Sequence, residues 1–120
     1  MLLNQGDKIL VIHRRIFESD KSRFFIGEVE AYEAGNAKIK GHTYARDPYT
    51  TVVFRKNEER IKIISLSSGT LFVYLLNSTI DLSKLRFDTD SSGSFQLKEG
   101  ERKIMDLNEI PHEEINPTPS

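Results

Sequence analysis

Five basic or aromatic residues occupy every second position of one segment: Lys38, Lys40, His42, Tyr44 and Arg46. In a β-strand successive side chains point to opposite faces, so all five would lie on one face. Single-stranded nucleic acid is bound by positive grooves with aromatic rings on which bases stack. The spacing therefore raises single-stranded nucleic-acid binding through this face as a hypothesis.

A second basic group surrounds a predicted long loop. Arg14, Arg15 and Arg23 flank it, and arginine can hold a phosphate or a carboxylate through two parallel hydrogen bonds. Glu18 and Asp20 lie in the same loop and could neutralise these arginines. Two interpretations stay open, a functional loop and a self-neutralised surface hairpin.

A third pattern is that of a calcium-binding loop. Asp88, Asp90 and Ser92 have the spacing of its first ligands, Gly93 follows, and Glu99 stands at the last ligand position. The flanks lack the long helices of that motif, and their apolar residues alternate with polar ones. This alternation favours a hairpin turn between two strands over a calcium site.

Other catalytic patterns are absent from the sequence. With no cysteine, the chain has no thiolate nucleophile, disulfide or cysteine-based zinc site. The three histidines show no metal-binding spacing, and neither a nucleophile elbow nor a glycine-rich phosphate loop occurs. We expect a non-enzymatic protein without metal or cofactor, although a carboxylate pair assembled by the fold is left open.

Short strands must position these residues. Runs rich in β-forming residues recur about every ten residues, which is typical of a barrel or a sandwich. Only residues 78–85 favour a helical turn, entered through a serine or threonine cap. The predicted strands are 8–15, 23–32, 36–46, 51–56, 61–66, 70–76, 85–88, 95–98 and 103–107.

One hairpin can be aligned in detail, because Glu33-Ala34-Gly35 has the form of a three-residue loop with glycine at the positive-φ position. Gly27 then faces Gly41 on the predicted core face, which indicates a sharp bend or a close approach of another strand. The outer face pairs Glu30 with Lys38, Glu28 with Lys40, Ile26 with His42 and Phe24 with Tyr44.

In this register the two glutamates cancel most of the field of the two lysines. His42, Tyr44 and Arg46 remain for binding, beside the exposed apolar side chains of Phe24 and Ile26. A solvated or partner-packed face is favoured over a ligand-binding one, and protein contact is at least as well supported as nucleic acid.

Two later strands are apolar on both faces, residues 61–66 and 70–76. A sheet with one solvated face needs apolar side chains on one side only. Either these strands are central and covered twice, or one of their faces is an oligomer interface.

Composition limits the protein to one modest globular domain. The chain has 120 residues, 38% hydrophobic and 29% charged, and a net charge of −1, which argues against a general polyanion binder. We expect one β-barrel domain over residues 1–110 and a flexible tail over 111–120. No apolar run is long enough to cross a bilayer and the first residues do not form a signal peptide, so we expect a cytoplasmic protein.

The sequence GDKILVI at 6–12, followed by FIGEV at 25–29, resembles the opening of SH3-like small barrels of the KOW and Tudor kind. In that family a Gly-Asp turn leads into the first strand and a G-x-V strand follows. The resemblance covers the N-terminal quarter of the chain. It implies a binding module whose ligand groove lies between loops.

These observations predict an all-β fold, a small antiparallel β-barrel, SH3-like or related, with an added C-terminal hairpin. The predicted function is a non-enzymatic binding or assembly module for a protein partner or a second copy of the chain, with no membrane contact. The alternatives are single-stranded nucleic-acid binding and a lipocalin-like barrel that encloses a small molecule. The expected binding residues are Arg14, Arg15, Arg23, His42, Tyr44, Arg46 and Tyr49.

Overall fold

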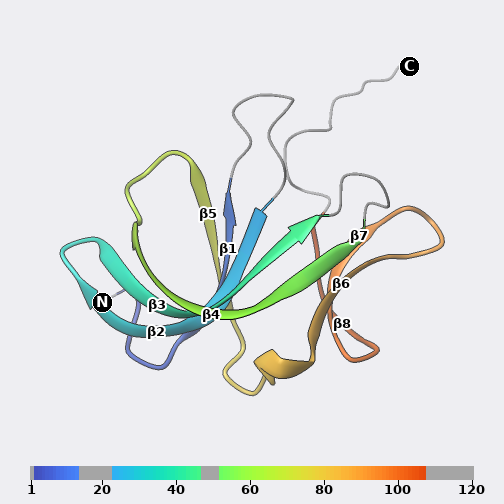
Figure 1. The fold of residues 1–120 in the computed structure, drawn as a ribbon, viewed down its shortest axis with the longest axis horizontal. Coiled ribbons are helices and arrows are strands. Elements are labelled where there is room, and N and C mark those ends of the chain that lie inside the picture. The colour runs from blue at the N-terminus through green and yellow to red at the C-terminus, as the bar shows by residue number, and fades with distance from the viewer. Residues whose placement is uncertain (1, 14–22, 47–51, 108–120) are drawn as a thin grey trace.

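The computed structural model describes residues 2–13, 23–46 and 52–107, which form two antiparallel sheets (Figure 1). The first sheet has the strand order β4-β3-β2-β1-β5 and the second the order β6-β7-β8. The strands are β1 Lys8–His13, β2 Arg23–Glu33, β3 Asn36–Arg46, β4 Val53–Ser65, β5 Leu71–Leu76, β6 Leu85–Thr89, β7 Phe95–Glu99 and β8 Arg102–Asp106. The predicted all-β class is confirmed, whereas neither sheet closes in this part of the chain, so a barrel is not confirmed.

The strand predictions need two corrections. Residues 51–56 and 61–66 were expected as separate strands, but residues 53–65 form the single strand β4. The expected C-terminal hairpin is a three-stranded sheet, because β8 pairs with the free side of β7. The predicted tail, 111–120, and the end of the predicted domain at residue 110 lie outside the described residues.

The helical turn expected within residues 78–85 is the 3₁₀ helix η1, Leu82–Lys84. Its cap is Asp81 rather than the expected serine or threonine. The Asp81 carboxylate accepts a hydrogen bond of 3.0 Å from the backbone N–H of Ser83, which satisfies a donor that the helix itself leaves unpaired. This turn joins the first sheet to the second.

Two hydrophobic cores lie on opposite faces of the first sheet. The first core fills the space between the two sheets and includes Leu10, Ile12, Phe24, Ile26, Tyr44, Leu85, Phe87 and Leu97. The second core lies on the other face and includes Ile9, Val11, Phe25, Val29, Ala37 and Ile39. Because β1 and β2 lie inside the sheet and contribute to both cores, their side chains are apolar on both faces.

The β2–β3 hairpin confirms the predicted register from Arg23 to Val29 and corrects it beyond that point. A bulge between Val29 and Ala31 shifts the pairing by one residue, so Lys38 faces Ala31 and not Glu30. The loop is correspondingly shorter by one residue than predicted. Ala34 and Gly35 both have positive φ, 52° and 80°, as the two central residues of a type I′ turn require.

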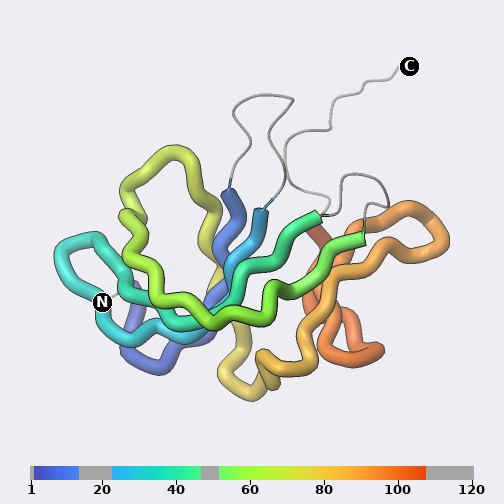
Figure 2. Tube along the Cα trace, in the orientation of Figure 1, coloured from blue at the N-terminus to red at the C-terminus, as the bar shows by residue number. Residues whose placement is uncertain are grey.

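Gly27 and Gly41 face each other where β2 and β3 touch most closely. A Cβ atom on Gly27 would lie 2.3 Å from the carbonyl oxygen of Lys40, and one on Gly41 would lie 2.1 Å from that of Ile26. Both contacts are with backbone, which cannot rotate away. The predicted close approach is therefore between the two strands of the hairpin themselves. The trace of β2 and β3 curves along its length (Figure 2).

We predict that Gly27→Ala or Gly41→Ala lowers the free energy of unfolding by ~2 kcal/mol or more, because the added methyl group forces the two backbones apart. Urea unfolding measures this change. Gly69→Ala is the matched control, because a Cβ there meets nothing within 4 Å. Equal stability of the Gly41 and Gly69 variants would contradict the argument.

Candidate functional site

A pocket of about 360 Å³ opens between β3, β4 and η1. His42 and Tyr44 line it from β3, Arg55 and Glu59 from β4, and Leu82 from η1. Two residues of the predicted binding site, His42 and Tyr44, thus meet two residues of β4 that the sequence did not single out.

An irregularity in strand pairing coincides with this pocket. His42 faces Glu59 and Tyr44 faces Arg55, so three residues of β4 stand opposite Thr43 alone. Such insertions bend a strand and interrupt its ladder of hydrogen bonds. The pocket also borders Gly41, which has no side chain to fill it.

The charges around the pocket balance. Lys40 and Arg55 are basic, and Glu28 and Glu59 are acidic. The Nζ atom of Lys40 lies 3.9 Å from Oε1 of Glu59, and both side chains are about half exposed, so this pair adds little stability. As predicted, Glu28 also faces Lys40. A pocket lined by balanced charge does not attract a polyanion.

Tyr44 is buried in the first core and is not an exposed ring. Its ring centroid lies 5.2 Å from that of Phe87 in an edge-to-face arrangement. Burial raises the pKa of Tyr44, and the charge of Arg55 partly opposes that rise. The expected exposure of Phe24 and Ile26 is wrong, because the second sheet covers both.

The other predicted binding residues are dispersed. The guanidinium carbon of Arg46 lies 4.8 Å from the centre of the Phe95 ring on the second sheet. Arg23 is exposed at the beginning of β2, two residues before Phe25 of the second core and therefore on the face opposite the pocket. The remaining predicted residues, Arg14, Arg15 and Tyr49, lie outside the described residues.

Apolar side chains extend the face that carries the pocket along β4. Ile61 is 57% exposed and Ile63 is 74% exposed, and they face Lys40 and Lys38 across the strand pair. β4 and β5 are the two edges of the first sheet, so the interpretation of residues 61–66 and 70–76 as central strands is wrong. We call residues 61–65 of β4 the β4 edge.

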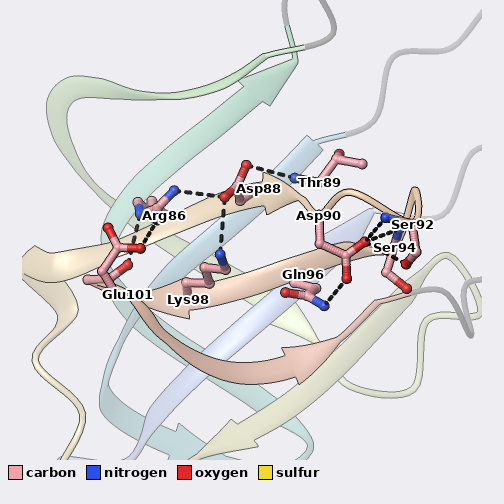
Figure 3. Close-up of polar contacts among 10 residues, drawn as sticks. Arg86, Asp88, Thr89, Asp90, Ser92, Ser94, Gln96, Lys98 and Glu101 are labelled. Carbon is pink, nitrogen blue, oxygen red and sulfur yellow. Dashed lines mark hydrogen bonds and ion pairs between the residues drawn. The ribbon is translucent and has the colours of Figure 1, made fainter.

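The residues of the calcium-like pattern form part of the second sheet (Figure 3). Asp88 accepts hydrogen bonds from Arg86 and Lys98, at 3.1 and 3.2 Å. Glu99 accepts the backbone N–H of Asp81 at 2.7 Å. Hydrogen-bond donors of the protein itself therefore occupy both carboxylates.

Asp90 holds the tip of the β6–β7 hairpin. Its Oδ1 atom accepts the backbone N–H groups of Ser92 and Ser94, both at 2.9 Å, and its Oδ2 atom accepts the Gln96 amide at 3.0 Å. Gly93 has a φ of 90°, which favours glycine. The predicted hairpin turn is confirmed.

Comparison with protein-family models, with curated proteins and with solved structures finds no match for this chain. Within residues 2–13, 23–46 and 52–107, no group of three or more histidine, aspartate or glutamate side chains is placed to hold a metal ion. No helix of these same segments is long and apolar enough to cross a membrane.

We predict that acid weakens the fold through the second sheet. Hydrogen bonds are the largest cause of lowered pKa values in four carboxyl groups, those of Asp81, Asp88, Asp90 and Glu99. A carboxyl group with a lower pKa in the folded state stabilises the fold above its unfolded pKa of about 4, and this contribution is lost as pH falls through the folded value.

Thermal melting between about pH 6 and pH 2 tests the prediction, with a melting temperature that falls across this range. Asp90→Asn removes one of the four titrating groups, so its melting temperature should depend less on pH. A wild-type melting temperature independent of pH across this range would contradict the assignment.

Proposed function

We propose that this protein is a non-enzymatic, protein-binding assembly module that associates with a second copy of itself through the β4 edge. The observation that carries the proposal is the exposure of Ile61 and Ile63 on a strand whose outer side has no partner among the described strands. Long edge strands with apolar side chains pair readily with another chain unless they are protected.

The protection on β4 is uneven. In its first half, the irregular pairing between His42 and Tyr44 and a run of charged residues oppose the addition of another strand. The second half pairs regularly with β3 and has the sequence Ile-Lys-Ile-Ile at residues 61–64. Among these four residues only Lys62 is charged. Its side chain extends away from this edge, with Nζ 4.7 Å from the centre of the Phe25 ring. The second half is therefore the open end of the strand.

An antiparallel pair of β4 edges can be centred on Ile63 without like charges in opposition. Centred on Ile63, it pairs Ile63 with its own copy, Ile61 with Ser65 and Lys62 with Ile64. Centred on Lys62, it would place two lysines directly opposite each other, which destabilises a strand pair. The proposal therefore includes the register centred on Ile63, in a two-fold dimer.

This contact is short. Five paired residues bury less than the roughly 1,200–2,000 Å² of surface typical of specific protein interfaces. We therefore expect a reversible equilibrium between monomer and dimer that depends on concentration.

We also infer that the first sheet is an SH3-like small barrel that stops short of closure. Both of its edge strands approach the second core, with Ile64 on β4 and Val73 on β5 packed against it. The resemblance of residues 6–12 and 25–29 to SH3-like barrels supports this assignment. The strand order leaves β4 as the outermost strand next to the pocket.

Light scattering during size-exclusion chromatography tests the assembly. We expect the measured mass to rise from 13.8 kDa toward twice that value as the protein concentration increases. Ile61→Lys and Ile63→Lys should hold the protein at the monomer mass, because each places a new charge in the interface.

Leu2→Lys is the matched control. Leu2 is 81% exposed but lies outside both sheets, so the same substitution there should leave association unchanged. A wild-type protein that stays monomeric at millimolar concentration overturns the proposal, and so does a Leu2 variant that dissociates as readily as the Ile63 variant.

A further inference from the structure

Three basic side chains lie on the second-core face near one end of the first sheet. His13 ends β1, Arg23 begins β2 directly opposite it, and Lys62 reaches over the Phe25 ring from β4. The three come from three different strands, so the fold and not a local sequence motif brings them together. We call them the cationic cluster.

These charges act on one another. The pKa of His13 is lowered by burial and then by the charges of Lys62 and Arg23. Burial is also the largest cause of the lowered pKa of Lys62, and the positive charges of Arg23, Arg60 and Lys56 lower it further. The positive charges of Arg23 and Lys62 thus oppose protonation of His13, and the charge of Arg23 opposes protonation of Lys62.

No acidic side chain of the described segments forms an ion pair with any of the three. Several other basic side chains do have acidic partners. Lys40 has Glu59, Arg86 and Lys98 share Asp88, and Arg102 has Glu99. A group of neighbouring basic side chains without an acidic partner among residues 2–13, 23–46 and 52–107 is the kind of local conflict expected at a functional site.

We propose that His13, Arg23 and Lys62 form a binding site for a phosphate group at the rim of the second-core face. Arginine presents a planar fork that matches two oxygens of a phosphate, lysine adds a compact charge, and a protonated histidine donates a further hydrogen bond. A phosphate, with more oxygens and more charge than a carboxylate, uses all three donors.

The site shares Lys62 with the β4 edge, but it lies on the face of the sheet opposite Ile61 and Ile63. Lys62 and Phe25 are on the second-core face, whereas Ile61 and Ile63 are on the face that carries the pocket. It also differs from the predicted nucleic-acid face, which holds His42 and Arg46. The failure of one proposal would therefore leave the other intact.

Binding of phosphate should raise the pKa of His13, because the anion stabilises the protonated ring. The charged groups that face His13 are Arg23 from β2 and Lys62 from β4, and β5 presents the apolar Leu71 opposite it. Since both of these charged neighbours are cations, a bound anion would reverse their effect. The affinity for singly charged phosphate should accordingly increase as pH falls below about 6.5, where His13 with its lowered pKa becomes protonated.

The test uses the full chain and two probes at low salt, where phosphate contacts are strongest. Binding of inorganic phosphate is measured from the NMR resonances of His13. Binding of a labelled oligothymidylate of ~12 nucleotides is measured by fluorescence anisotropy. Binding of both probes, or of phosphate alone, identifies a small phosphorylated ligand as sufficient. Binding of the oligonucleotide alone identifies the nucleic-acid backbone as the source of the phosphate.

Arg23→Gln and Lys62→Gln should each weaken binding by about tenfold or more, the loss expected for one charge-assisted hydrogen bond. Lys62→Arg keeps the charge and should restore most of the affinity, which separates the role of the charge from packing on Phe25. Lys38→Gln removes the same charge from the opposite face of the sheet and should have little effect. The proposal is overturned if neither probe binds, or if Lys38→Gln weakens binding as much as Lys62→Gln does.

Discussion

The contact between Gly27 and Gly41 is the constraint on which the first sheet depends. Two backbones meet there at a distance that leaves no room for a Cβ atom on either strand. Around this contact, side-chain alternation places Phe24 and Ile26 beneath the second sheet and Val29 and Ile39 in the second core. β4 follows β3 and becomes the outermost strand.

Much of this fold can be predicted from alternation and turn residues, and the errors have physical causes. The register of β2 and β3 was correct up to Val29, because charged and apolar pairs match only one alignment. It failed beyond that point because Ala34 adopts a positive φ that is unfavourable for alanine, so only Gly35 signalled the turn. The polar residues in the middle of β4 resembled a loop, because an edge strand exposed to solvent needs no apolar alternation there.

The candidate site was predicted less well than the fold. Alternation correctly placed His42 and Tyr44 on one face, but it carries no information about what covers that face. The cover comes from Phe87 and its neighbours on the second sheet, some forty residues further along the chain. Arg55 and Glu59 reach the pocket through irregular pairing that their own residue types do not signal. Likewise, no motif links His13, Arg23 and Lys62, because only the three-dimensional arrangement of the strands brings them together.

The position of β1 also bears on how the chain is made. β1 pairs on one side with β2 and on the other with β5, whose residues follow about sixty positions later, as in the pairing of Lys8 with Leu76. On a ribosome, β1 and β2 emerge early, while one side of the apolar run from Ile9 to Ile12 waits unpaired for β5. Synthesis thus passes through an interval in which β1, an internal strand of the finished sheet, is still an open edge. During that interval the nascent chain is most exposed to aggregation and most in need of chaperones.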